Sequence, residues 1–336
     1  MYKIKKNFLD GRLFIAVLVL TTALVVTSMA SLSLGSVSIS LPDIWQALLH
    51  EGDPINQTII WDLRMPRIIA AMLVGSALGM SGALLQGMLR NSLASPFILG
   101  ISAGAGLVTV GMIVLGIWIN WVPFAAWLGA IVTAITVIFL GRSQGGIRVE
   151  RLVLGGVAVS SLLGAVQSTL LLLAEDGRVQ QALNWLIGSL NGRGWEQIKI
   201  AAPYMITALI VGCLLARWVN VLALGDDLAV GLGVSLVRSR LLIGGVATLL
   251  AAGAVSIAGL ISFVGLVVPH GVRLLVGTDY RVCLPLSALG GAWLLTFADL
   301  LSRLGAVELP VGSVTALLGS PVFIWLLYRR SGAMTG

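Results

Sequence analysis

Apolar residues gather along this chain in long, nearly uninterrupted runs separated by short polar segments. Ten such runs lie at residues 13–34, 66–85, 96–116, 122–140, 151–174, 197–217, 240–258, 260–276, 283–303 and 310–328. An α-helix needs about 20 apolar residues to cross the hydrocarbon core of a bilayer, which most of these runs provide. The pattern predicts an all-α, polytopic membrane protein with about ten transmembrane helices, in which residues 1–336 form one membrane domain. The boundary between the seventh and eighth runs is the weakest, because only Gly259 and its neighbours interrupt them.

The first run could be a signal peptide or the first spanning helix. Three lysines precede it, and the small residues of Ser28-Met29-Ala30 resemble a cleavage site. The run is nevertheless long enough to span, and many further spans follow. We therefore expect an uncleaved first helix.

Composition supports a membrane location. Hydrophobic residues make up 58% of the chain and charged residues only 10%, against about 25% in soluble domains. So few charges cannot cover a surface that faces water. The 41 glycines, some in small-xxx-small patterns such as Gly75–Gly79 and Gly100–Gly104, favour close packing of helices in lipid.

The distribution of basic residues predicts the orientation. An even number of spans puts both termini on one side of the membrane. With the termini inside, 15 of the 21 basic residues lie on the inner side, and the outer side keeps six: Arg64, Arg67, Arg178, Arg193, Lys199 and Arg303. The positive-inside rule then places both termini in the cytoplasm, in a bacterial inner membrane. Because the net charge of +7 is spread over many loops, it does not indicate nucleic-acid binding.

Motifs for catalysis are missing from the sequence. No HExxH or GxSxG occurs, and none of the four lysines follows a glycine, so there is no Walker A motif for ATP hydrolysis. The two cysteines, Cys213 and Cys283, sit in apolar runs, and we interpret them as buried, inert thiols. We expect neither a metal site nor a cofactor. A membrane enzyme, such as a lipid-modifying transferase, would need clustered polar residues at one membrane face, which the sequence does not show.

An ion-coupled secondary transporter is the other alternative. Such proteins usually keep an ionisable residue near the middle of the membrane. Asp299 comes closest, but Arg303 lies four residues further on the same helical face and can pair with it. We therefore expect a structural ion pair near the outer end of the ninth helix rather than a proton site.

Several segments together resemble the iron-chelate and cobalamin ABC importer permeases. They are WDLRMPRIIAAMLVGSALGMSGALLQGMLRNSLASPFILGISAGAG from residue 61, LALGDDLAVGLGV from residue 222, GLISFVGLVVPHGVRLLVGTDYRVCLPLSALGGAWLLTFADLLSRL from residue 259 and ELPVGSVTALLGSPVFIWLLYRR from residue 308. The resemblance implies a type II ABC importer permease fold, paired with a second permease subunit, identical or paralogous. It also implies two copies of a cytoplasmic ATPase and an extracytoplasmic substrate-binding protein.

The resemblance also assigns roles to residues. It places Arg64, Arg67 and Arg303 opposite carboxylates of the docked binding protein, although interfacial snorkelling would place arginines at span ends as well. It identifies Asn91 and Leu93 as part of an inner gate. The translocation pathway is expected along the fifth helix, with Ser160, Ser161, Gln167, Ser168 and Thr169.

The resemblance places the ATPase contact at residues 222–233, a segment that without the resemblance would be interpreted as an ordinary amphipathic loop helix. Asp226 and Asp227 suit the start of a short helix, where Asp226 can act as the cap. Leu228, Ala229 and Leu232 would form one apolar face that fits a groove in the ATPase. The complete set is Leu222, Ala223, Leu224, Gly225, Asp226, Asp227, Leu228, Ala229, Gly231, Leu232 and Gly233.

The segment LNWLIGSLNGRGW from residue 183 resembles the ferric siderophore and ferric citrate permeases more than the cobalamin one. We therefore expect an iron chelate as the cargo, with cobalamin or haem as the alternatives. A chelate keeps its own metal ligands, so we interpret His270 as a packing residue. Ser92 departs from the family, which usually has proline there, and Ser does not restrict the preceding residue as proline does.

Overall fold

The computed structural model describes residues 2–35, 37–143, 146–305 and 307–332. Its helices are α1 (Tyr2–Ser33), α2 (Leu41–Leu48), α3 (Pro54–Thr58), η1 (Ile59–Arg64), α4 (Met65–Met88), η2 (Pro96–Leu99), α5 (Ile101–Leu115), η3 (Ile119–Trp121), α6 (Val122–Leu140), α7 (Val149–Leu172), α8 (Asp176–Ile187), α9 (Trp195–Leu214), α10 (Ala216–Ala223), α11 (Asp226–Gly231), α12 (Leu236–Ala258), α13 (Val264–Val276), α14 (Tyr280–Ser302) and α15 (Val311–Gly332). Two-residue strands, β1 (Arg142–Ser143) and β2 (Gly146–Ile147), pair antiparallel between α6 and α7.

The all-helical prediction is confirmed. Among the described residues, seven helical segments are long and apolar enough to cross a membrane, and three shorter apolar helices, within α5, α13 and α15, accompany them. Together they cover the ten apolar runs of the sequence. The short helices α5 and α13 each follow a non-α-helical segment, η2 before α5 and residues 259–263 before α13, which is why the corresponding runs begin before the helices do.

The boundary between the seventh and eighth runs lies at residues 259–263. Gly259 ends α12 with a φ of +72°, a conformation that glycine adopts without strain. Phe263 also has a positive φ, of +67°, which is unusual for a bulky residue. Its ring contacts that of Phe323 on α15 at 6.5 Å between centroids.

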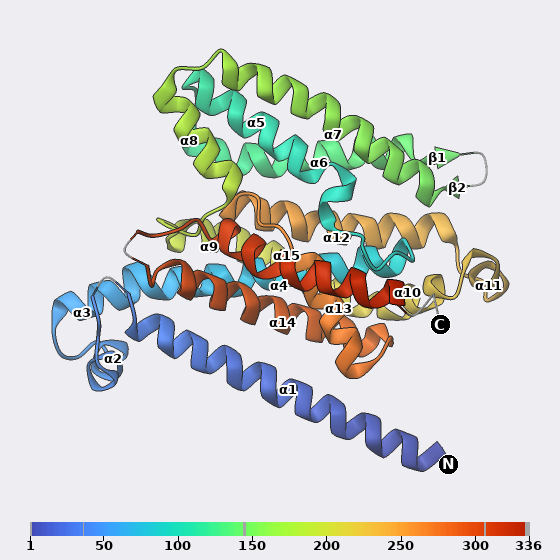
Figure 1. The fold of residues 1–336 in the computed structure, drawn as a ribbon, viewed down its shortest axis with the longest axis horizontal. Helices are drawn as coiled ribbons and strands as arrows, with labels where there is room; N and C mark the ends of the chain where they lie inside the picture. Colours follow the sequence, from blue (N-terminus) through green and yellow to red (C-terminus); the bar gives the residue numbers. More distant parts are fainter. Residues whose placement is uncertain (1, 36, 144–145, 306, 333–336) are drawn as a thin grey trace.

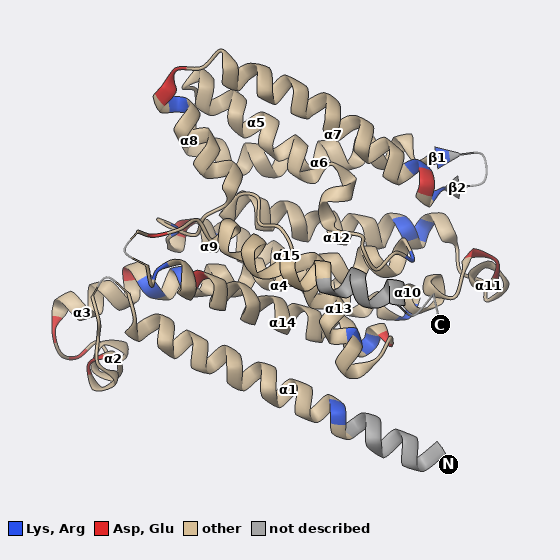
Figure 2. Ribbon diagram, in the orientation of Figure 1, with Lys and Arg blue, Asp and Glu red and all other residues tan. Residues whose placement is uncertain are grey.

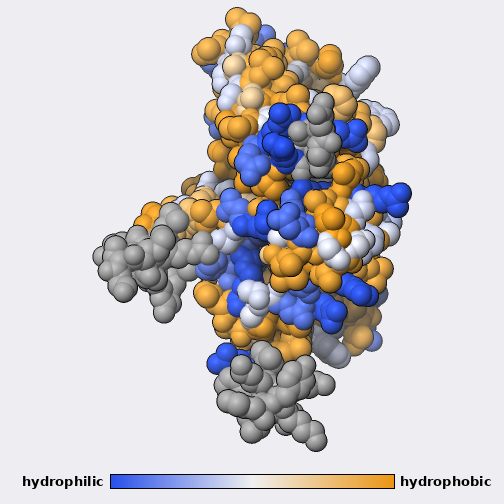
Figure 3. Space-filling model, turned by 90° about the vertical axis from the view of Figure 1, so that its right-hand side faces the viewer, coloured by the Kyte–Doolittle hydropathy of each residue, from blue (hydrophilic) through white to orange (hydrophobic). Residues whose placement is uncertain are grey.

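The helices form a bundle with two polar ends (Figure 1). The "α2 end" holds α2, α3, η1, the loop after α14 and the loop between α8 and α9. The "α11 end" holds α10, α11 and the β-hairpin, and α1 begins and α15 ends on this side. Lys and Arg side chains lie mainly at these two ends (Figure 2). Figure 3, which views the α11 end, shows hydrophilic side chains gathered over its centre.

Helix α4 is the central element of the bundle. Its neighbours α14 and α13 approach it backbone to backbone, because glycines remove the side chains that would separate them. A Cβ atom on Gly75 would lie 2.2 Å from the carbonyl oxygen of Gly291 on α14, and one on Gly82 would lie 1.8 Å from that of Gly265 on α13. Helices α1 and α7, in contrast, leave most of their apolar surface uncovered in the single chain.

The expectation that both cysteines are buried is wrong for Cys213. Cys283 is buried in α14, where its sulfur lies 3.8 Å from the Ser287 hydroxyl. Cys213, on α9, is exposed. Apolar sequence context cannot separate a residue that faces lipid from one that faces the core.

Candidate functional site

The first cluster of interest lies at the α2 end, where η1 and the start of α4 present two arginines. The Arg64 side chain is buried, and its guanidinium donates to the backbone carbonyls of Leu32 and Val37. These carbonyls belong to the end of α1 and to the loop that follows it. Arg64 therefore ties the first helix to the start of the second spanning segment.

Arg67 makes the strongest ion pair of the cluster. Its Nε donates to both carboxylate oxygens of Asp299, at 2.9 and 3.1 Å, and its Nη2 lies 2.8 Å from the same carboxylate. A second bond, of 2.7 Å, joins Nη2 to Glu308. Because the Asp299 side chain is only 1% exposed, this pair is shielded from water and from salt screening.

Arg303 shares the Asp299 carboxylate. Its Nε lies 3.3 Å from Oδ2, which confirms the ion pair predicted from the i, i+4 spacing. The sequence did not indicate that Arg67 would be the closer partner, because the two residues are 232 positions apart. The Nη2 of Arg303 is buried and finds no hydrogen-bond acceptor in the part of the chain that the structure describes.

A pocket of about 810 Å³ opens beside this cluster. Its lining includes all three arginines that the family resemblance singled out, and it also includes Arg193 from the loop between α8 and α9. The structure thus brings the three predicted arginines together. It places Arg64 and Arg67 in internal bonds, whereas Arg303 keeps a donor without a partner. Their docking role stays a prediction.

The second cluster lies at the α11 end, on α10 and α11. Leu228 is 60% exposed, and Leu224 and Leu232 are similarly open, so apolar side chains face outward from this short helix. Ala229 is fully buried. The prediction that Leu228, Ala229 and Leu232 form one outward apolar face is therefore wrong for Ala229. Val230, which the sequence analysis did not select, is 58% exposed instead.

Asp226 does not cap α11, contrary to expectation. Gly225 is the N-cap, without a side-chain bond, and the Asp226 carboxylate accepts from Arg240 on α12 at 2.8 and 2.9 Å. A longer contact, of 3.7 Å, joins Asp226 to Arg90. An ion pair across 14 residues outcompetes the local cap because the Arg240 side chain is nearly buried and needs a counter-charge.

The expected gate residues follow Arg90 directly. Asn91 and Leu93 are both exposed, and the Asn91 side chain accepts from the Leu93 backbone at 2.9 Å, which shapes the loop. The sequence analysis missed the residue that holds this loop, Gln86. Its amide nitrogen donates to the carbonyls of Ala94, Gly265 and Leu266, and its oxygen accepts from Arg273 at 2.5 Å.

The five expected pathway residues on α7 do not share one face. Ser160 and Gln167 are partly buried, and they lie beside Gly100 and Gly106 on the α5 side. Ser161, Ser168 and Thr169 are exposed. No group of three His, Cys, Asp or Glu residues that could hold a metal ion occurs in the described residues.

The described bundle has several spanning helices and an exposed apolar helix at one end. At the other end it has an arginine-lined pocket, an arrangement typical of a multi-pass transport permease. The sequence pattern of the FecCD transport family matches residues 23–329. The chain therefore belongs to this family, and it is a multi-pass membrane permease of the ABC importer type.

Two relatives and one solved structure show the range of the likeness. The chain is 44% identical over 289 residues to the cobalamin import system permease protein BtuC of Halobacterium salinarum, covering 85% of this chain and 78% of that protein. It is 39% identical over 319 residues to the Fe(3+) dicitrate transport system permease protein FecD of Escherichia coli, covering 93% and 98%. A metal-chelate type ABC transporter in an inward-facing conformation aligns with a TM-score of 0.84 and 31% identity, over 96% of this chain and 99% of that one.

We predict that Asp299→Asn lowers the stability of the protein by about 3–5 kcal/mol, because Arg67 and Arg303 would lose their buried counter-charge. Glu308→Gln should cost about 1 kcal/mol or less, since that carboxylate is 36% exposed. Thermal unfolding of the purified variants in detergent measures both. Equal effects of the two substitutions would contradict the central role of Asp299.

Proposed function

We propose that this chain is the membrane-spanning subunit of an importer that carries an iron chelate of the ferric siderophore or ferric citrate type. A separate ATPase binds at the α11 end, and a soluble binding protein delivers the chelate to the α2 end. The observation that carries the proposal is the family match over residues 23–329, combined with one outward-facing apolar helix and one arginine-lined pocket at opposite ends of the bundle.

The cargo is the finer part of the proposal. The segment 183–195 resembles the ferric chelate permeases, and FecD is similar over nearly its whole length. Cobalamin is the second candidate, because the BtuC relative is more identical to this chain, although over a shorter segment. A reconstituted complex decides between them. Ferric citrate, a ferric hydroxamate, haem and cobalamin are each loaded on the binding protein, and the one that stimulates ATP hydrolysis is the cargo.

A second permease subunit, identical or paralogous, completes the proposed importer. Helix α7 supports this, because most of its surface is uncovered in the single chain, with exposed apolar residues such as Leu154 and Leu162 beside the exposed polar residues Ser161 and Ser168. A second subunit would bury this surface.

We predict that the α11 end, including both termini and residues 217–240, faces the cytoplasm, because most basic residues lie there. In a background with Cys213→Ser and Cys283→Ser, Asp227→Cys should react with an impermeant thiol reagent only after the cells are opened. Asp53→Cys should react in intact cells. The reverse pattern would contradict the orientation.

We predict that Leu228→Asp abolishes import while leaving membrane insertion and thermal stability unchanged, since the side chain is exposed in the single chain and a charge would be forced into an apolar groove of the ATPase. Gly231→Asp should act in the same way, because a Cβ atom there meets nothing within 4 Å. Leu228→Met is the matched control and should transport normally. Full import by the Asp variants would show that α11 is not the ATPase contact.

We predict that Arg303→Gln weakens association with the binding protein roughly 30-fold or more, as expected for about 2 kcal/mol or more from a buried charge pair. Arg178→Gln, which lies in the first turn of α8 and outside the pocket, is the control. Replacing both Arg64 and Arg67 by Glu should also weaken association. Because both side chains bond other groups of this chain, the stability of the variant is measured together with its affinity for the binding protein. Unchanged affinity of Arg303→Gln at low salt would remove Arg303 from the docking site.

A further inference from the structure

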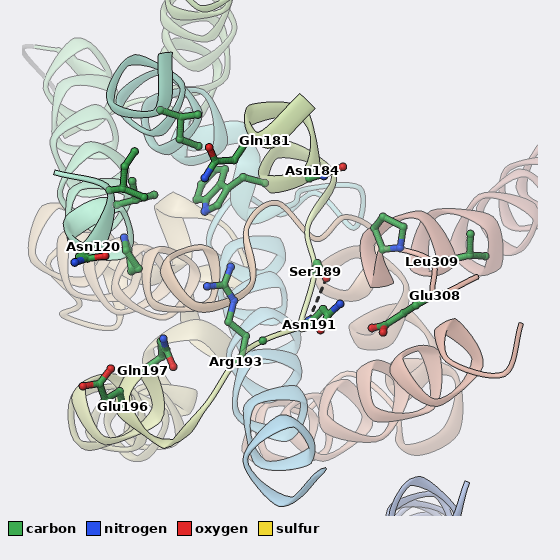
Figure 4. Close-up of a pocket in the computed structure, with 17 residues that line it drawn as sticks. Asn120, Gln181, Asn184, Ser189, Asn191, Arg193, Glu196, Gln197, Glu308 and Leu309 are labelled. Atoms are coloured by element: carbon green, nitrogen blue, oxygen red, sulfur yellow. Dashed lines mark hydrogen bonds between the residues drawn. The ribbon is translucent and has the colours of Figure 1, made fainter. Parts of the chain in front are cut away.

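A second pocket at the α2 end, of about 760 Å³, shares Asn191, Gly192, Arg193 and Glu308 with the one beside the arginine cluster, and the rest of its lining is different. Its walls come from η3, the start of α6, α8, the loop between α8 and α9, and the segment before α15. The volume lies in the usual range for small-molecule sites, about 300–1,000 Å³. Amide and hydroxyl side chains dominate its polar lining, and they are Asn120, Gln181, Asn184, Ser189, Asn191 and Gln197 (Figure 4).

Arg193 stands in the wall between the two pockets and lines both. Its Nε is buried, and in the part of the chain that the structure describes it finds no hydrogen-bond acceptor and no ion-pair partner. Figure 4 shows its guanidinium pointing toward the side of the pocket where Gln181 lies, away from Glu196. A half-buried guanidinium without a counter-charge is costly unless a ligand supplies one.

Burial lowers the pKa of Arg193 from its usual value, because desolvation disfavours the charged form. The group still keeps its proton, since the pKa of an arginine starts far above any physiological pH. The site therefore holds a fixed positive charge that its surroundings do not neutralise.

Two amides in the lining of the pocket have their oxygens engaged. The Asn184 oxygen accepts from Gln180 at 3.2 Å, and the Gln197 oxygen accepts from the Gly194 backbone at 3.0 Å. Their NH₂ groups are therefore the part of each amide left to donate. Amide donors in the same lining as a guanidinium suit a ligand rich in acceptor oxygens.

The acidic residues in the lining do not cancel this preference. Glu308 already pairs with Arg67 at 2.7 Å. Glu196 is exposed to solvent in the first turn of α9, where the helix dipole favours a negative charge.

From this geometry we infer that the pocket around Arg193 is a binding site for a carboxylate-bearing small molecule, and that it gives the permease a preference for anionic, carboxylate-type metal chelates. The inference rests on the proposed import function for its role in transport, but the binding site itself can be tested without transport. A concave pocket lined by amides fits a small molecule better than it fits the surface of a docked protein. The chelate, rather than the binding protein, therefore supplies the carboxylate.

The first test measures binding of radiolabelled, iron-free citrate to the permease complex in lipid nanodiscs. The wild type should bind citrate at one site per chain. Arg193→Gln should weaken binding at least about tenfold, because a charge-assisted bidentate contact is lost, and Arg193→Lys should restore part of it. Lys199→Gln removes a positive charge from the same end outside the pocket and should bind as the wild type does. Absence of citrate binding, or an equal effect of the two Gln variants, overturns the inference.

The second test separates this inference from the proposed function. In proteoliposomes, Arg193→Gln should raise the half-saturating concentration of ferric citrate and leave that of a ferric hydroxamate unchanged. If the wild type imports a chelate but Arg193→Gln does not change the uptake of ferric citrate, the inference fails and the proposed function stands. If no chelate is imported while citrate binds through Arg193, the site stands and the function fails. If Arg193→Gln weakens association with the binding protein but leaves citrate binding intact, Arg193 is a docking residue and the inference is overturned.

Discussion

The close approach of α4 to its neighbours is the constraint on which the rest of the structure depends. In lipid, helices gain nothing from hiding apolar surface, so packing and short backbone contacts must hold them together. Gly75, Gly79 and Gly82 let α4 touch the backbones of α14 and α13. A side chain at any of these positions would separate the helices and disturb both ends of the bundle.

Helix α4 carries a bonded side chain near each of its ends. Arg67, in its first turn, bonds Asp299 and Glu308, while Gln86, in its last turn, bonds the loop of Asn91 and Leu93 at Ala94 and the start of α13 at Gly265. The α2 end and the α11 end are therefore connected by one buried helix. If α4 moved along α14, the Arg67–Asp299 pair would break, or the glycines of α4 would slide past the backbone of α14. Both are costly in a close-packed interior that excludes water.

The sequence predicted the fold well because the length of an apolar run is read directly from the sequence, without knowledge of which residues meet in space. The i, i+4 spacing predicted the local Asp299–Arg303 pair, and the family resemblance singled out the three arginines and the apolar loop helix. The sequence missed the Arg67–Asp299 pair and the bonds of Gln86, which join residues far apart in the chain. It also misplaced Ala229 and Cys213, since composition alone does not tell which side of a helix faces the protein.

The bonds of Asp226 indicate how a force on α11 would enter the membrane domain. Its contact with Arg90, which directly precedes Asn91, is 3.7 Å long and joins two side chains that are each more than a third exposed, so it contributes about 1 kcal/mol at most. Its bonds to Arg240 are short, and the Arg240 side chain is only 5% exposed, so breaking them would leave a buried charge unpaired. The stronger connection runs from α11 to α12. A displacement of α11 would therefore act first on α12, rather than directly on the loop that follows Arg90.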